Sequence, residues 1–185
     1  MSTDQPDAPH LTAPIQVASL NGRRSREVLI EPDAATCAQV ARFLNLSALR
    51  KFRFHGRLDP SGARDWTLSG SLGATVEQPC GVTLAPVTTR IDERVIRHYV
   101  ADWHEPEGGE VEMTVDPTID PLGTRIDLSS AVTEALALAV PDFPRAPGVA
   151  LSRDGSLRAA PSGQTPLDDD AVKPFAALRD KLNRP

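Results

Sequence analysis

Residues 126–141 read IDLSSAVTEALALAVP and form the clearest apolar helical pattern in this sequence of 185 residues. The side chains that recur at helical spacing predict one buried face: Leu128, Val132, Ala135, Leu136 and Ala139. Leu138 lies on or beside that face, and Glu134 is the only charged residue between Asp127 and Asp142. A helix this apolar needs a large cover, and we expect an antiparallel sheet formed by the preceding chain.

The ends of this helix are also marked in the sequence. Asp127 is suited to cap the N-terminus, because its carboxylate can accept hydrogen bonds from the first free backbone N–H groups. Pro141 lacks an N–H group and disfavours the helical conformation at Val140, so we expect the helix to end there.

Upstream, apolar and polar residues alternate as they do in strands. Short strands are predicted at 14–20 and 26–30, joined by a turn at Asn21-Gly22. The runs 49–58 and 66–76 should form a hairpin around Asp59-Pro60-Ser61-Gly62, with Gly70 as a candidate bulge.

The chain should stay extended over 82–100, with a further strand at 111–115. The adjacent apolar residues Val95 and Ile96 break the alternation and indicate a bulge or a short helical turn. A second helix is expected after Pro32, capped by Asp33 and closed by a left-handed Asn45. Its buried stripe consists of Cys37, Val40, Ala41 and Leu44.

These elements predict one α+β domain over residues 10–148, in which a curved antiparallel sheet packs against the helices 33–44 and 127–139. An open sheet and a partly closed barrel both fit the pattern. Residues 1–9 are expected to form a disordered tail, and 149–172 a flexible linker rich in Pro, Gly, Ser and Asp. A short helical motif is predicted at 173–183.

Composition excludes several classes of protein. The sequence lacks a long apolar run and an apolar signal-peptide core, so we expect a cytoplasmic protein without a membrane span. We expect Cys37 and Cys80 to be reduced thiols. Charge is uneven: residues 1–100 carry 12 basic and 10 acidic residues, whereas 101–185 carry 8 and 15. This asymmetry weakly indicates a surface that faces a polyanion.

Signatures of catalysis and of cofactor binding are missing from the sequence. No glycine-rich phosphate-binding loop precedes a helix, and Ser69-Gly70-Ser71 lacks the spacing of a nucleophile elbow. Cys80 lacks obvious catalytic partners, and the histidines near Asp102 match no metal-binding spacing. We therefore expect a non-enzymatic protein without a metal or other cofactor.

One strand carries a row of basic side chains on a single face. Within 49–58 the apolar residues occupy one face, and the other face holds Lys51, Arg53, His55 and Arg57. Arg23 and Arg24, on an earlier turn, extend this set of candidate RNA-binding residues. Such a row can follow a phosphate backbone, while a merely solvated outer face is the alternative reading.

Three segments resemble the YceD-like family of large-subunit ribosomal RNA accumulation proteins. They are the turn and strand at 80–87, the helical stretch at 126–144, and Lys173-Pro174-Phe175-Ala176-Ala177-Leu178 near the end. Many relatives carry Cys-x-x-Cys at the turn, but here Glu77 stands at the first cysteine position, so a structural zinc is not expected.

The resemblance implies a role in accumulating or maturing large-subunit ribosomal RNA. The expected partner is this RNA or a pre-ribosomal particle. The alternative is a protein-binding adaptor that does not touch nucleic acid. Its docking candidates are Pro174, Phe175, Leu178 and Leu182 in the C-terminal segment.

Overall fold

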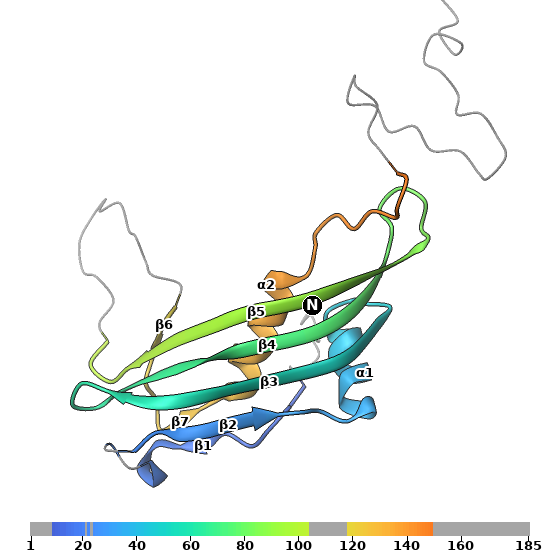
Figure 1. Ribbon diagram of the computed structural model, residues 1–185. Helices are drawn as coiled ribbons and strands as arrows, with labels where there is room; N and C mark the ends of the chain where they lie inside the picture. The colour runs from blue at the N-terminus through green and yellow to red at the C-terminus, as the bar shows by residue number, and fades with distance from the viewer. Residues whose placement is uncertain (1–8, 21, 23, 104–117, 150–185) are drawn as a thin grey trace, which may run out of the picture. The chain divides into compact units, whose positions relative to one another are not determined.

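The computed structural model describes residues 9–20, 22, 24–103 and 118–149 (Figure 1). Outside these residues lie the predicted strand at 111–115, residues 1–8 of the predicted tail, residues 150–172 of the predicted linker and the C-terminal motif at 173–183. The chain divides into two compact units, and each is described separately. The first comprises residues up to Gln78 together with Thr88–Asp142, and the second comprises Pro79–Val87 and the chain from Phe143 onward.

The first unit is built on a five-stranded sheet with the strand order β2-β3-β4-β5-β6. The strands are β2 (Arg26–Ile30), β3 (Ala48–Ser61), β4 (Asp65–Pro79), β5 (Pro86–Val100) and β6 (Ile119–Pro121). The pairs β2–β3 and β3–β4 are antiparallel, whereas β6 runs parallel to β5. The described strands form an open sheet, so the α+β prediction is confirmed and the sheet is not a closed barrel.

The predicted apolar helix is α2 (Leu128–Ala139), which crosses one face of this sheet (Figure 1). The Asp127 carboxylate accepts hydrogen bonds from the backbone N–H groups of Ser129 and Ser130, as expected for the N-cap. Val132 and Leu136 are fully buried, but Leu138 is 78% exposed and does not belong to the apolar face. The buried stripe thus runs through Leu128, Val132 and Leu136.

The second predicted helix is α1 (Ala34–Phe43), packed beside β3 (Figure 1). Asp33 accepts a hydrogen bond from the Thr36 backbone N–H over 2.8 Å, and Asn45 has a φ angle of 55°, as the sequence predicted. Cys37, Val40 and Ala41 are buried in the same core as α2, whereas Leu44 is only partly buried.

The predicted hairpin between the first two strands is wrong. β1 (Ile15–Gln16) pairs with β7 (Arg125–Ile126), and a 3₁₀ helix (Val17–Ser19) follows it. The Ser129 hydroxyl also accepts hydrogen bonds from the backbone N–H groups of Leu11 and Thr12. The N-terminal segment is therefore attached to the start of α2, which a local turn signal cannot reveal.

Two details of the β3–β4 hairpin also differ from the prediction. Pairing continues to Ser61 and Asp65, so the turn lies after Ser61. Gly70 does not form a bulge: it pairs directly with Gly56, and both lie against the ring of Phe54. A Cβ atom on Gly70 would lie 2.6 Å from Phe54 Cζ, so a side chain is excluded here by contact with the core.

The irregularity predicted near Val95 is not a helical turn. β5 is one strand through this region, in which Val95 is buried and Ile96 is 37% exposed. Neither described helix is long and apolar enough to span a membrane.

Leu136→Ala should lower the free energy of unfolding by about 2–5 kcal/mol, because it leaves a cavity between α2 and the sheet. Leu138→Ala is the matched control and should change the free energy by less than about 0.5 kcal/mol. Denaturant unfolding of both variants measures the difference. Equal losses at the two positions would show that α2 is not packed as described.

Candidate functional site

The outer face of the sheet contains a broad groove of about 1000 Å³. Its walls are formed by outward-facing side chains of β3 and β5, and its floor is formed by β4. We call it the basic groove, and its charged residues are Lys51, Arg53, Arg90, Arg94, Asp92 and Glu93. The rest of its lining consists of His55 from β3 and of Ser71, Leu72, Gly73 and Thr75 from β4.

A β-bulge in β3 aims Lys51 into this groove. Between Arg50 and Arg53 the partner strand advances only from Thr75 to Gly73, so β3 contains one extra residue. Lys51 takes up the irregularity with a φ angle of 51°, in the left-handed region that disfavours side chains. Such a backbone costs about 1–3 kcal/mol when a side chain is present. The bulge exposes both Arg50 and Lys51, whereas strict alternation would place one of them inside.

Gly73 lets a basic side chain from β5 reach across the floor. A Cβ atom built on Gly73 would lie 2.5 Å from the Nη2 atom of Arg90. The guanidinium therefore occupies the space above a residue without a side chain. On the other side, Gly73 pairs with Arg53 of β3. The sheet register thus places arginines from both walls beside the same glycine.

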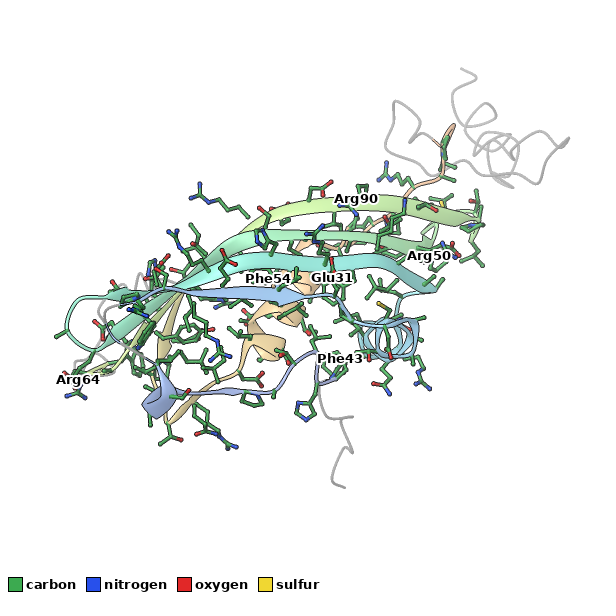
Figure 2. All side chains as sticks on the ribbon, turned by 60° about the horizontal axis from the view of Figure 1, so that its bottom comes forward. Glu31, Phe43, Arg50, Phe54, Arg64 and Arg90 are labelled. Atoms are coloured by element: carbon green, nitrogen blue, oxygen red, sulfur yellow. The ribbon has the colours of Figure 1, made fainter. Side chains whose placement is uncertain are left out.

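Both of these arginines already have carboxylate partners. The Arg53 Nε atom lies 3.0 Å from Glu31 Oε1, and the Arg90 Nε atom lies 2.9 Å from Asp92 Oδ2. Figure 2 shows Arg90 on β5 and Glu31 just beyond β2, on opposite sides of β3 and β4. The Arg90 guanidinium lowers the pKa of Asp92, and all four side chains remain about half exposed.

Lys51 and Arg94 differ from these paired arginines. Neither forms an ion pair with any residue in the described part of the chain. The groove therefore offers two uncommitted cations and two arginines held by exposed carboxylates. An anion could contact the first pair directly and compete for the second.

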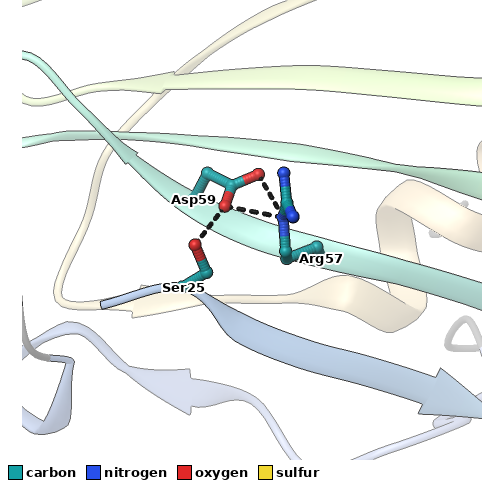
Figure 3. A network of polar contacts seen from close by, with 3 residues as sticks. All are labelled: Ser25, Arg57 and Asp59. Carbon is teal, nitrogen blue, oxygen red and sulfur yellow. Dashed lines mark hydrogen bonds and ion pairs between the residues drawn. The ribbon is translucent and has the colours of Figure 1, made fainter. Parts of the chain in front are cut away.

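Only part of the basic row that was predicted on β3 lines the groove. All four residues of the row are exposed on the outer face, but Arg57 does not line the groove. Its Nε atom lies 2.8 Å from the Asp59 carboxylate, which also accepts a hydrogen bond from Ser25 (Figure 3). Bonds from Ser25 and then Arg57 lower the pKa of Asp59. Arg24 is exposed outside the groove lining, and Arg23 lies outside the described residues.

Sequence reasoning missed the contribution of β5. The alternation at 87–94 already indicated that Arg90 and Arg94 face outward, on the side opposite to Val87 and Ile91. The sequence does not show which strand pairs with β4 on the side opposite to β3. Arg90 and Arg94 were therefore not grouped with Lys51 and Arg53 as candidate site residues. The docking candidates in the C-terminal segment lie outside the described residues.

The histidines near Asp102, His98 and His104, were considered as metal ligands together with Asp102 and Glu105, and the described members have other partners. His98 Nδ1 lies 3.1 Å from the Thr67 hydroxyl oxygen, and Asp102 pairs with Arg64 at 3.3 Å. His104 and Glu105 lie outside the described residues. Across the described ranges, no group of three or more His, Cys, Asp or Glu residues is arranged to hold a metal ion.

Cys80 belongs to the second unit, where it begins the loop between β4 and β5. Its sulfur accepts hydrogen bonds from the backbone N–H groups of Val82 at 3.5 Å and Ala146 at 3.3 Å. Together with bonds from Thr83, which have the largest effect, they lower the pKa of the Cys80 thiol to about 6. In contrast, the pKa of the Cys37 thiol is raised, mainly by burial and to a smaller extent by the negative charge of Asp33. Both cysteines are free thiols.

This contrast predicts two separate thiol titrations. The ultraviolet absorbance of thiolate should show one ionisation near pH 6 that is lost in Cys80→Ser, and one above the ordinary thiol value of about 9 that is lost in Cys37→Ser. Because the folded pKa of Cys80 is depressed, its contribution to stability is complete above pH 9 and disappears as the pH falls to 6. Two coincident titrations near 9 would contradict this account of the loop.

Comparison with known families identifies the chain. The family described as "Large ribosomal RNA subunit accumulation protein YceD" matches residues 68–180, which is more than half of the sequence. Comparisons with curated proteins and with solved structures gave no match. The matched region includes most of β4, all of β5 and α2, and both arginines on the β5 wall of the groove. The chain is a member of the YceD family.

Proposed function

We propose that this protein supports the accumulation of large-subunit ribosomal RNA by binding RNA in the basic groove, without catalysing a reaction. The family description names the biological process, and the groove supplies a surface suited to a polyanion. The observation that carries the proposal is that basic side chains of two different strands line one groove: the Arg90 side chain of β5 extends over Gly73, and Arg53 is the register partner of Gly73 on β3. Arginines gathered in this way are favourable where phosphates neutralise them.

Backbone strain supports the same surface. Lys51 keeps a left-handed conformation, and the bulge that causes it adds a cation to the groove. Strained residues of this kind are concentrated at functional sites, where the surrounding structure holds them in place. The partner strands on both sides of the bulge return to regular pairing, so the strain is confined to this point.

The first test removes positive charge from the groove. Lys51→Gln, Arg53→Gln and Arg94→Gln in one variant should weaken RNA binding at least about tenfold and reduce the salt slope by roughly one unit for each lost phosphate contact. Thermal stability should barely change, because exposed substitutions usually shift it by less than about 0.5 kcal/mol. RNA binding across salt concentrations and co-sedimentation with large-subunit precursors measure the effect.

A matched control removes the same charge elsewhere. Arg50, Arg57 and Arg64 are exposed, lie outside the groove and pair with Glu77, Asp59 and Asp102. Changing these three to Gln should leave RNA binding close to that of the unaltered protein at moderate salt. If both triple variants lose binding equally, the net charge of the protein matters and the groove does not.

Removing a competing carboxylate should act in the opposite direction. Glu31→Gln frees Arg53 from its 3.0 Å ion pair, so RNA affinity should rise severalfold. Glu27→Gln is the control: it removes the same charge from exposed β2, outside the groove lining. Unchanged or weaker binding by Glu31→Gln would show that Arg53 does not contact the RNA.

One observation favours a second candidate, a protein-binding role. A cleft of about 330 Å³ lies between β5 and α2, lined partly by Leu138, Ile96, Ala135 and Ala139. Leu138 is 78% exposed there beside other apolar side chains, and contiguous apolar patches of this kind can mark protein-interaction sites. If Leu138→Lys abolishes co-sedimentation while the groove triple variant keeps it, the protein-adaptor function replaces the RNA-binding proposal.

A further inference from the structure

The geometry of the basic groove points to one class of RNA. Its two walls stand on β3 and β5, which are separated by β4 alone. Neighbouring strands lie about 4.8 Å apart, so the walls are roughly 10 Å apart. An RNA double helix does not enter such a space, because it holds two backbones with stacked base pairs between them and is wider than about 10 Å. One sugar–phosphate backbone does fit between the walls.

The side chains that form the β3 wall are spaced at the regular interval of an extended strand. Residues at alternate positions on a strand project from the same face about 6.6 Å apart. Lys51, Arg53 and His55 are spaced in this way, although the bulge shifts Lys51 locally. An extended single strand of RNA presents one phosphate per nucleotide at a comparable interval. The side chains of β3 can therefore meet successive phosphates.

Among the described residues, the groove lining contains no Phe, Tyr or Trp side chain, and the imidazole of His55 is its one aromatic ring. Sites that bind single strands through their bases usually stack them on Phe, Tyr or Trp. The floor instead presents the hydroxyl groups of Ser71 and Thr75, on either side of Gly73 and the Arg90 guanidinium above it. Hydroxyl groups can donate to and accept from the ribose 2′-OH, the group by which proteins distinguish RNA from DNA.

We infer that the basic groove binds a single-stranded segment of RNA along β4, through its phosphates and 2′-OH groups and without reading its sequence. Phosphates contact Lys51 and Arg94 directly and replace the carboxylates of Glu31 and Asp92 at Arg53 and Arg90. The inference rests on the proposed function, because it specifies what occupies the same groove. It adds strandedness, indifference to sequence and preference for RNA over DNA.

The test compares four fluorescent probes with the full chain: oligouridine, a mixed-sequence unstructured RNA, the blunt duplex of that RNA, and the matching single-stranded DNA. About 12 nucleotides suit the roughly 4–16 nucleotides of known single-strand sites. The two single-stranded RNAs should bind within about threefold of one another, and both at least tenfold tighter than the duplex. With four cationic contacts, the salt slope should be near −3, at about −0.7 per contact.

Duplex binding equal to or tighter than single-strand binding overturns this inference while the proposed function stands. Binding of neither form overturns both. A strong preference for one single-stranded sequence also refutes the inference, since it requires contacts to bases.

Two variants locate the binding within the groove. Gly73→Ala should lower single-strand affinity at least fivefold, because its Cβ displaces the end of the Arg90 side chain. That side chain is flexible, so the fold should remain stable in a thermal melt. Ser71→Ala with Thr75→Ala should reduce the preference for RNA over DNA while leaving the salt slope unchanged. Unaltered binding by a folded Gly73→Ala protein, or an unaltered RNA preference in the second variant, counts against the inferred path along β4.

Discussion

The burial of α2 against the sheet is the constraint on which the rest of the first unit depends. Val132 and Leu136 lose all contact with water there, together with Leu68, Leu72 and Val76 of β4 elsewhere in the same core. At about 25 cal/mol per Å² of buried apolar surface, the packing of such a helix stabilises the sheet substantially. The sheet must present a continuous apolar surface to α2. The inward-facing positions on the strands are therefore apolar, and the charged residues lie on the opposite face.

That division of the sheet explains how the basic groove is possible. The inner face is fixed by packing, so the outer face is free to carry Arg53, Arg90 and Arg94 without cost to the core. One charged side chain breaks the division: Arg97 is only 7% exposed and is held by Glu134 of α2 and by Asp120 of β6. The paired carboxylates offset the cost of burying the guanidinium, and they connect β5 to both neighbours.

Sequence patterns predicted the elements that depend on local signals. Helical periodicity and two aspartate caps gave α1 and α2, and alternation gave β2, β3 and β4 with their inward faces. Long-range facts were not predictable in this way: Asn21-Gly22 is a strong turn signal, yet β1 pairs with β7. The position of Leu138 was misjudged because it lies at the edge of the apolar stripe. Half of the candidate site was missed for a similar reason, since the order of strands decides that Arg90 and Arg53 line the same groove.

The attachment of the N-terminal segment to β7 and α2 has a consequence for the order of folding during synthesis. Ile15 pairs with Ile126, and Leu11 and Thr12 bind Ser129, so these early residues must wait until the ribosome has released more than 100 further residues. The hairpin of β3 and β4 joins neighbouring segments and can form much sooner. Until α2 emerges from the ribosome, however, the apolar face of this hairpin remains exposed to water. The nascent chain thus exposes a half-built core over most of its translation, which is the period when chaperones protect such surfaces.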